Sequence, residues 1–388
     1  MDITIHPGKL CGSITAIPSK SQAHRLLICA AFSDGVTTLI CPETNRDIEA
    51  TVDCLNALGA KIARTENGYS IQPIGAAAKN AVLNCCESGS TLRFMLPIVG
   101  ALGIDALIQM EGRLPYRPLS PLWEEMERMG CRLSRPTETT IRCEGKLCAG
   151  TYTIDGGVSS QFITGLLFAL SLIDGASNLE ITGKVESKPY IDMTKAALAL
   201  FSAPDYHTPG LVEVEGDWSN GAFFLAARAL GNNLTVSNLN PHSPQGDRAA
   251  AALIPALEKN ITIDASDIPD LVPILAVVAA EKKGATFTNI QRLRLKESDR
   301  VATVMDMICS LGGKAEATED TLTVYSTGFT GGTVNSYNDH RIAMAAAIAA
   351  TACSAPVTIL GANAVNKSYP AFWDEYRKLG GNYEQYLR

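Results

Sequence analysis

The sequence predicts an α/β protein of two domains, each built from three repeated units. The first observation behind this prediction is length, because 388 residues exceed one ordinary hydrophobic core and suit two domains. The second is that six apolar, Ala- and Leu-rich stretches each follow a polar residue and recur every 50 to 71 residues. The third is that amphipathic stretches and short β-branched runs lie between them, as expected for alternating helices and strands.

The first set of predicted helices begins with Ser, Asp or Asn. These side chains accept hydrogen bonds from the free N–H groups of a first helical turn. The stretches that follow are apolar around most of the helix, so we expect these helices to be buried. The six segments are Ser19–Phe32, Ser88–Ala101, Ser159–Leu172, Asp217–Leu230, Asp267–Ala280 and Asn338–Thr351.

The second set of predicted helices is amphipathic, and four of its members end in Gly, a common C-terminal cap. Its segments are Asp47–Gly59, Ser120–Gly130, Pro189–Phe201, Arg248–Lys259, Ser298–Gly312 and Pro370–Gly380. Ala285–Ile290 and Thr321–Tyr325 are predicted strands. An ordinary doubly wound α/β protein also alternates helices and strands, and spacing alone does not exclude it.

The composition argues against several classes of protein. A net charge of −7 disfavours general nucleic-acid binding, which needs a basic face. Apolar stretches such as Phe162–Leu172 are too short to span a membrane, and the N-terminus shows no secretion leader, so we expect a cytoplasmic protein. The eleven cysteines include no CxxC pair and the five histidines show no ligand spacing. We therefore expect reduced thiols, no metal site and no cofactor.

Basic and polar residues gather at the predicted helix starts. A helix N-terminus offers free N–H donors and about half a positive charge, which suits an anion. So many cations beside Gly and Ser in an acidic chain predict phosphate and carboxylate ligands. Gly89 would let the backbone approach a ligand closely, although alone a simple helix-start turn explains it almost as well. The residues are Lys20, Ser21, Arg25, Ser88, Gly89, Ser90, Arg93, Ser159, Ser160, Gln161, Asp270, Asp339, His340 and Arg341, with Arg113, Arg117, Lys188, Arg292, Arg294, Lys296, Arg300 and Lys367 in loops.

At these positions the sequence resembles the 5-enolpyruvylshikimate-3-phosphate synthase family over essentially the whole chain. Each motif alone is weak, but the ordered set is highly specific. The motifs are Pro18–Arg25, Ser88–Arg93, Ser159–Phe162, Ser187–Thr194, Ile268–Leu271, Arg292–Arg300, Asp339–Met344 and Lys367–Pro370.

The resemblance implies a two-domain inside-out α/β barrel. Its six βαβαββ-type units, three per domain, would pack their helices inside. Residues 1–18 and 216–388 would form a discontinuous first domain, and residues 19–215 the second. The active site would lie in the cleft between the domains, which closes on ligand.

The resemblance also implies an activity. Enzymes of this family transfer the enolpyruvyl group of phosphoenolpyruvate to the 5-hydroxyl of shikimate 3-phosphate, in the shikimate pathway to aromatic amino acids. The products are 5-enolpyruvylshikimate 3-phosphate and phosphate, formed by addition and elimination through a tetrahedral intermediate. We therefore expect a transferase that acts as a monomer without cofactor, nucleic acid or membrane, and that glyphosate inhibits at the phosphoenolpyruvate site.

Site residues follow from motif position. Shikimate 3-phosphate would bind Lys20, Ser21, Arg25, Ser159, Ser160, Gln161, Ser187, Tyr190, Asp270 and Lys296, and phosphoenolpyruvate would bind Lys20, Gly89, Arg117, Gln161, Arg300, Arg341 and Lys367. Asp270 would take the hydroxyl proton and Glu297 would serve as acid and base at C3, with Lys296 beside Glu297. Lys20 is the third predicted catalytic residue. Without the resemblance, Asp270 would be read as a first-turn capping residue and Glu297 as a salt-bridge partner of Arg300. Arg93 is expected to be structural.

Three departures from the family pattern stand out. Pro18 precedes Ser19 directly, without the usual intervening Gly, which would stiffen the first crossing between domains. Glu87 replaces the usual Asn and would repel an anion unless it turns away or pairs with a cation. Residues 260–266 are too short for the hairpin expected before Asp270, so we predict a trimmed fourth unit.

Two other functions remain open. The sister enzyme that acts on UDP-N-acetylglucosamine usually has a reactive cysteine in the loop equivalent to Gly112–Pro118, where this chain has none. A non-catalytic anion-binding protein on the same scaffold would tolerate loss of Asp270 and Glu297, so the presence of both favours catalysis.

Overall fold

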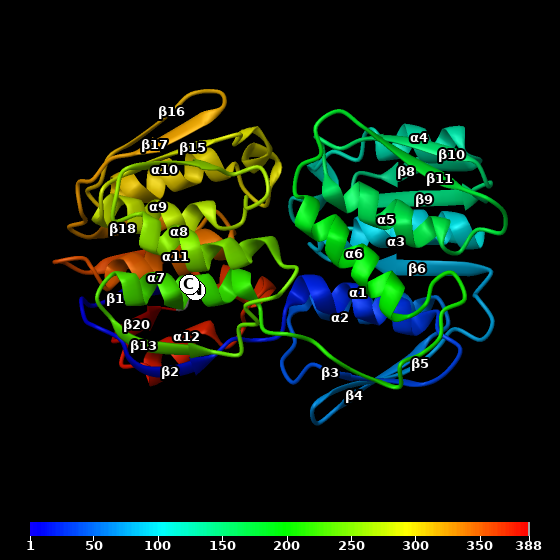
Figure 1. Cartoon of the computed structure of the whole chain (residues 1–388), viewed down its shortest axis with the longest axis horizontal. Helices are drawn as coiled ribbons and strands as arrows, with labels where there is room; N and C mark the ends of the chain where they lie inside the picture. Colours follow the sequence, from blue (N-terminus) through cyan, green and yellow to red (C-terminus); the bar gives the residue numbers. More distant parts are fainter. Residues whose placement is uncertain (387–388) are drawn as a thin grey trace. The chain divides into compact units, whose positions relative to one another are not determined.

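The computed structural model describes residues 1–386, and the chain divides into two compact units (Figure 1). Unit 1 comprises Met1–Ile17 and Glu215–Arg388, and unit 2 comprises Pro18–Val214. Unit 2 is therefore a continuous segment inserted into unit 1.

Unit 2 contains six α-helices among its strands. The helices are α1 (Lys20–Ala31), α2 (Arg46–Ala57), α3 (Gly89–Leu102), α4 (Leu122–Arg128), α5 (Ser160–Leu170) and α6 (Lys188–Leu200). The strands are β3 (Thr37–Ile40), β4 (Lys61–Thr65), β5 (Gly68–Gln72), β6 (Asn80–Asn84), β7 (Asp105–Gln109), β8 (Cys131–Thr137), β9 (Thr140–Gly145), β10 (Thr151–Asp155), β11 (Asn178–Thr182) and β12 (Leu211–Glu213). A short 3-10 turn, η1 (Leu114–Tyr116), follows β7.

Unit 1 has a similar content within the described residues. Its helices are α7 (Trp218–Ala229), α8 (Ala250–Ala256), α9 (Val272–Glu281), α10 (Arg300–Ser310), α11 (His340–Ala350) and α12 (Phe372–Lys378), with 3-10 turns η2 (Gly246–Ala249), η3 (Gln291–Leu295) and η4 (Ala362–Lys367). Its strands are β1 (Asp2–Ile5), β2 (Cys11–Thr15), β13 (Asn233–Ser237), β14 (Ile261–Asp264), β15 (Ala285–Thr288), β16 (Ala315–Ala317), β17 (Thr321–Val324), β18 (Gly332–Asn335), β19 (Val357–Leu360) and β20 (Tyr383–Tyr386).

The strands form three sheets in each unit, and the pairing rule repeats. Four sheets have four strands in the orders β12-β3-β5-β4, β6-β7-β9-β8, β14-β15-β17-β16 and β18-β19-β1-β20. In each of them the first pair is parallel and the next two are antiparallel. The remaining sheets, β10-β11 and β13-β2, contain the parallel pair alone. The repeat predicted from the sequence is thus present, but two of its six copies lack the antiparallel strands.

The prediction of a trimmed fourth repeat is confirmed. Only residues 257–260 separate α8 from β14, and β14 pairs with β15 in the next sheet. Sheet β10-β11 is shortened in the same way, which the sequence analysis did not predict.

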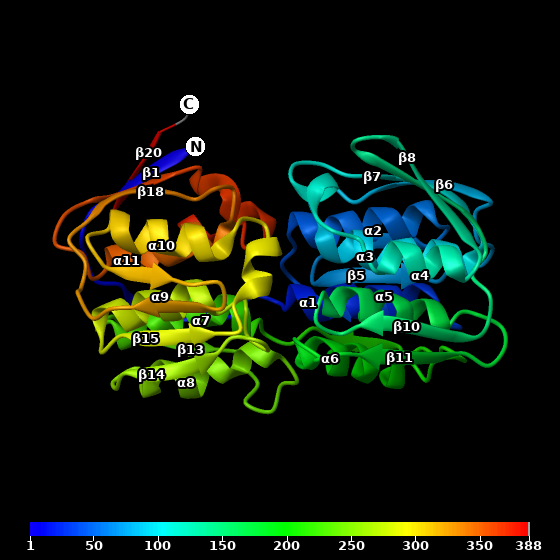
Figure 2. The ribbon, with the colours of Figure 1, turned by 90° about the horizontal axis from the view of Figure 1, so that it is seen from above.

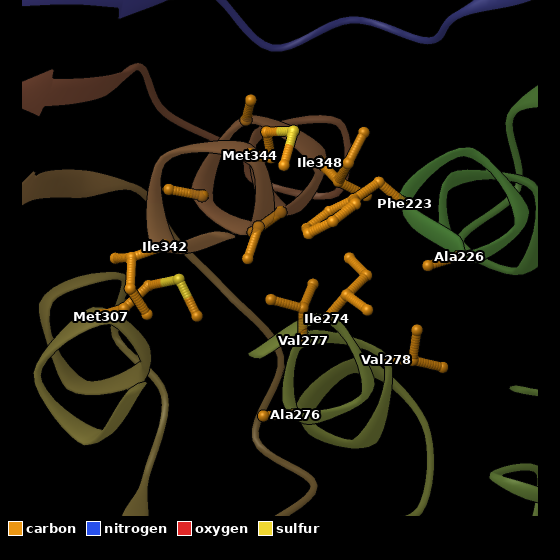
Figure 3. Close-up of a cluster of buried hydrophobic side chains, with 14 of the residues drawn as sticks. Phe223, Ala226, Ile274, Ala276, Val277, Val278, Met307, Ile342, Met344 and Ile348 are labelled. Carbon is orange, nitrogen blue, oxygen red and sulfur yellow. The ribbon is translucent and has the colours of Figure 1, made fainter. Parts of the chain in front are cut away.

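The helices predicted to be buried lie inside the units, and the sheets lie outside (Figure 2). Every residue of α11 is buried, as are nine of the ten residues of α9. In unit 1, Phe223 of α7, Ile274 and Val277 of α9 and Ile348 of α11 meet in one apolar cluster (Figure 3). The prediction of an α/β fold with its helices packed inside is confirmed.

The predicted start of the fifth buried helix is wrong. We expected it at Asp267 with Asp270 in its first turn, but α9 begins at Val272 and Asp270 lies in the turn before it. Pro273 lacks a backbone N–H, which suits the first turn of a helix, and Pro269 disfavours helical geometry in the residue before it. Asp270 is therefore held on an irregular segment, where its side chain is not used to cap a helix.

Candidate active-site residues

Arg300 is the centre of a buried ion-pair cluster in unit 1. It is the first residue of α10 and is 1% exposed. Its Nη1 lies 2.5 Å from Asp270 Oδ1, its Nη2 lies 2.6 Å from Glu297 Oε2, and its Nε lies 2.9 Å from Asp339 Oδ2. The rigid planar fork of Arg can serve several carboxylates at once, so it fixes both predicted catalytic carboxylates beside each other. With Lys296 and Arg341, these residues form what we call the Arg300 cluster.

Asp270 is surrounded by cations. Besides Arg300, it pairs with Arg341 at 3.2 Å and with Lys296 at 3.6 Å. Burial alone would raise the pKa of Asp270, but these three neighbours outweigh burial and hold its pKa well below the usual range. The ionised carboxylate can accept a proton readily only when bound anions offset that positive charge.

The pKa of Lys296 is also lowered, but for a lysine this shift disfavours the charged form. Burial lowers its pKa to about 8, although Asp270 favours the charged form. Its charge is therefore sensitive to the environment, and an anionic ligand would raise the pKa.

Asp247 belongs to the same region and was missed by the sequence analysis. It lies in η2, is buried, and its Oδ1 accepts no hydrogen bond from the described chain. Burial and the neighbouring Asp270 raise its pKa to about 7, while Arg341 opposes them. An acidic residue in the QGDR segment was the available signal, but it looked like an ordinary first-turn acid.

The other predicted residues of unit 1 lie at the start of α11 and at the end of η4. Asp339 caps α11 by accepting from the N–H of Arg341. Lys367 donates to the carbonyl oxygen of Asn338 at 2.8 Å. Tyr337 and Asn338 have φ values of 52° and 56°, so a tight left-handed turn brings that carbonyl to Lys367.

In unit 2, Arg25 is a buried cation that donates hydrogen bonds to neutral oxygens. It is 2% exposed, and it donates to Thr194 Oγ1 at 2.9 Å, to Ser21 O at 2.6 Å and to Tyr190 O at 3.0 Å. Thr164 Oγ1 completes the set at 3.4 Å. Burial lowers the pKa of Arg25 to about 10, far above neutral pH. A buried charge paired only with dipoles would be stabilised by an anion.

Lys20 is the first residue of α1 and differs from Arg25 in having an acidic partner. Its Nζ lies 2.9 Å from Asp47 Oδ2 in the first turn of α2. The sequence analysis missed this role of Asp47, because an acid in a first turn is usual for any helix.

The starts of α3 and α5 are brought together by close helix packing. A Cβ on Gly165 would lie 2.1 Å from Arg93 O, so α5 approaches α3 closely only because this residue is Gly. Across that contact, Gln161 accepts from Arg93 Nη1 at 2.9 Å and donates to Ser90 Oγ at 2.9 Å.

Two guanidinium groups cover Gly89 at the start of α3. A Cβ on Gly89 would lie 2.6 Å from Arg117 Nη1 and 2.7 Å from Arg93 Nη1. Two cations therefore lie next to the start of this helix, a combination that suits an anion.

Glu87 turns towards the loop after β7. A Cβ on Gly112 would lie 2.6 Å from Glu87 Oε2, so the carboxyl group packs directly on Gly112. The side chains nearest to Gly89 are those of Arg117 and Arg93, and the repulsion expected from Glu87 is correspondingly reduced.

The remaining predicted residues of unit 2 lie at the starts of α5 and α6. Ser159 caps α5 by accepting from Gln161 N, and Ser160 is buried. Ser187 precedes α6 with a left-handed φ of 54° and is also buried. Tyr190, in the first turn of α6, accepts from Arg25 through its carbonyl. The structure thus groups the predicted residues into two clusters, one in each unit.

Three further properties follow from the described residues. Between residues 1 and 386, the helices are too short or too polar to cross a membrane. The same part of the chain holds no group of three His, Cys, Asp or Glu side chains arranged to hold a metal ion. All eleven cysteines are free thiols, as predicted.

Comparison with solved structures shows the class of fold, that of the enolpyruvyl transferases. An EPSP synthase from Acinetobacter baumannii aligns with a TM-score of 0.78 at 22% identity, over 99% of both chains. The enolpyruvyl transferase NikO from Streptomyces tendae aligns with a TM-score of 0.74 at 16% identity, over 99% of this chain and 98% of that one.

Sequence comparison identifies the family. Residues 5–376 match the family described as EPSP synthase (3-phosphoshikimate 1-carboxyvinyltransferase). The 3-phosphoshikimate 1-carboxyvinyltransferases of Clostridium kluyveri and Clostridium perfringens strain 13 are each 37% identical to this chain. The alignments cover 99% and 98% of this chain, and 98% of each relative. The chain belongs to the EPSP synthase family, and the resemblance inferred from its motifs is confirmed.

Proposed function

We propose that the protein transfers the enolpyruvyl group of phosphoenolpyruvate to the 5-hydroxyl of shikimate 3-phosphate. Family membership supports this activity. The structural observation that carries it is the pair of clusters, one with a buried cation that suits an anion and one with carboxylates that suit proton transfer. We further propose that residues of both clusters take part in the reaction.

In unit 2, Arg25 supplies the main reason to place shikimate 3-phosphate. Its charge is buried among neutral oxygens, so a phosphate dianion would neutralise that charge. Ser159, Ser160 and Ser187 would add hydroxyl and backbone donors at the starts of α5 and α6. Ser21, Gln161 and Tyr190 would complete this site, with Asp270 and Lys296 from unit 1.

Phosphoenolpyruvate would occupy the second anion site. Gly89 and Arg117 would bind it at the start of α3, and Lys20, Gln161, Arg300, Arg341 and Lys367 would add further donors. Its carboxylate and phosphate would neutralise cations that now surround Asp270, which would raise the pKa of that carboxyl group and make it a better base.

The reaction needs two proton transfers. Asp270 would accept the proton of the 5-hydroxyl as its oxygen attacks C2, while Glu297 would deliver a proton to C3. In the second step Glu297 would take a proton back from C3, the C2–O bond to phosphate would break, and phosphate would leave with the electron pair. Arg300 would hold both carboxylates in position.

The test is phosphate release from phosphoenolpyruvate with each candidate acceptor. We expect release with shikimate 3-phosphate and none with UDP-N-acetylglucosamine. Binding of both substrates without turnover would instead identify a non-catalytic anion-binding protein, and absence of release with shikimate 3-phosphate would refute the assignment.

We also propose that glyphosate competes with phosphoenolpyruvate, and that the protein acts as a cytoplasmic monomer, as expected for the family. The Glu87 carboxyl group packs on Gly112 and leaves cations next to Gly89, which supports inhibitor binding. An inhibition constant far above the KM for phosphoenolpyruvate would contradict this proposal, and sedimentation would establish the oligomeric state.

A further inference from the structure

A chain of hydrogen-bonded side chains runs beneath the helix starts of unit 2. His24 Nδ1 of α1 lies 2.7 Å from Thr51 Oγ1 of α2, which lies 2.8 Å from Thr91 Oγ1 of α3. Thr91 Oγ1 donates in turn to Ser88 Oγ at 2.8 Å. All four side chains are fully buried. We call these residues the His24 chain.

The protonation state of His24 helps to determine which group donates in each hydrogen bond of the His24 chain. Burial, then Lys20 and Arg25, lower the pKa of His24 well below the usual range, so the ring is neutral and carries one N–H. Because Thr91 donates to Ser88, the consistent arrangement has Thr51 donating to Thr91 and His24 Nδ1–H donating to Thr51. His24 Nε2, which has no hydrogen-bond partner in the described chain, then bears only a lone pair.

The His24 chain connects the residues that hold Lys20 and Gly89. Ser88 is the N-cap of α3, and Gly89 is the first residue of that helix. The Thr91 hydroxyl also lies 3.4 Å from the carbonyl oxygen of Asp47, whose carboxylate holds Lys20. Polar contacts therefore link the first turns of α1, α2 and α3 to one another.

The neighbouring residue on α1 belongs to a different network. Arg25 bonds to Thr194 and Thr164, which bond to each other at 2.9 Å, and these residues belong to α6 and α5. Helix α1 thus contacts α2 and α3 through His24, and α5 and α6 through Arg25. The two sets of hydrogen bonds described here share no side chain.

We propose that the His24 chain is a positioning network that fixes the start of α3 at Gly89 and so sets the affinity for phosphoenolpyruvate, while the Arg25 network sets the affinity for shikimate 3-phosphate. The inference rests on the proposed function. A displaced helix start misplaces several donors at once, and a shift of about 1 Å can cost about a hundredfold in rate.

The test replaces the central hydroxyl of the chain. Thr51→Val keeps the shape of the side chain but removes both hydrogen bonds, and we expect the KM for phosphoenolpyruvate to rise about tenfold with less than a twofold change for shikimate 3-phosphate. Thr51→Ser keeps the hydroxyl and should restore a KM within about threefold of the wild type. Thr194→Val should give the reverse result, raising the KM for shikimate 3-phosphate.

If Thr51 acted only through packing, the KM values of its two variants would follow a different order. Thr51→Ser removes a buried methyl group, so a packing role would make it at least as harmful as Thr51→Val. Ser171→Ala, which removes a partly buried hydrogen bond to Tyr206 at the far end of α5, is the control and should change neither KM. If Thr51→Val does not fold, Thr91→Val is measured in its place with the same expectation.

Three results would overturn the inference: an unchanged KM for phosphoenolpyruvate, an equal rise in both KM values, or no difference between the Ser and Val variants. An inactive wild-type protein would instead refute the proposed function. The two failures are therefore distinguishable in one set of assays.

Discussion

Arg25 in α1 of unit 2 and Arg300 in α10 of unit 1 are both buried, yet the groups around them differ in charge. Arg300 pairs with Asp270, Glu297 and Asp339. Arg25 meets hydroxyl and carbonyl oxygens. Arg300 is therefore compensated by the protein itself and organises carboxylates, whereas Arg25 is compensated only by dipoles and suits an anionic ligand. Similar scaffolds thus surround a buried arginine with carboxylates in one unit and with neutral oxygens in the other.

The largest expected effect comes from removing the proton acceptor of unit 1. Asp270→Asn should lower kcat by about 10²- to 10⁴-fold, the usual range for loss of a general acid or base, with much smaller changes in either KM. Steady-state kinetics would measure it. Asp105→Asn, which breaks a surface ion pair with Arg142, is the matched control and should keep kcat near the wild-type value. A large fall in both variants would contradict the assignment.

The stability of two arginine variants tests the comparison directly. Arg300→Met removes the cation that Asp270, Glu297 and Asp339 share, and we expect a loss of about 3–5 kcal/mol in the free energy of unfolding. Arg25→Met removes a buried charge that has no carboxylate partner, so its loss should be at least about 2 kcal/mol smaller. Denaturant unfolding would measure both. Equal losses would show that Arg25 is as strongly compensated as Arg300.

Gly89 offers a smaller, local change in unit 2. Gly89→Ala places a methyl group 2.6 Å from Arg117 Nη1 and 2.7 Å from Arg93 Nη1, so the flexible guanidinium groups must move while the helix remains. We expect the KM for phosphoenolpyruvate to rise about tenfold, with little change for shikimate 3-phosphate. Gly75→Ala, at a glycine with open space around its Cβ position, provides the control.

The smallest predicted effect is a pH dependence from Lys296. Its pKa of about 8 in the folded protein lies below the value of about 10.4 for an unperturbed lysine. As the pH rises through 8, Lys296 loses the charge that helps to bind anions, so kcat/KM should fall several-fold between pH 7 and 9. The substrate complex should resist this fall, because bound phosphate raises the pKa.

The same group affects stability with the opposite sign. Between pH 8 and 10.4 the unfolded chain binds more protons at Lys296 than the folded chain, so this residue makes folding more favourable as the pH rises. Lys296→Arg keeps the charge at high pH and should flatten the fall in kcat/KM. An unaltered pH profile in that variant would assign the titration to another group.

The helices could be predicted because their signals are local. Ser88, Ser159 and Asp217 each begin an apolar stretch, and each caps a helix in the structure. The start of α9 also has a local signal, because Pro273 in its first turn indicates a helix that begins after Asp270 and not at Asp267. Helix boundaries are less certain than helix existence for this reason.

The environment of the site residues could not be predicted in the same way. Thr164 and Thr194 lie 139 and 169 residues from Arg25 along the chain, and nothing in either segment indicates that they surround a buried guanidinium group. Asp247 and Asp47 look like ordinary first-turn acids in the sequence. Their roles depend on the packing of separate repeats, and the assignment of substrates to these residues stays a prediction.

The parallel pairing of β2 with β13 has a consequence for the order of events during synthesis. Residues 11–15 pair with residues 233–237, and β1 pairs with β19 and β20 near the end of the chain. At about 5–20 residues per second, the ribosome needs roughly 10–40 s to supply the partner of β2. Unit 2 is made without interruption during that interval, so it can complete its sheets while the N-terminal strands wait. Strand β1, the first to be synthesised, is therefore among the last to find its partners.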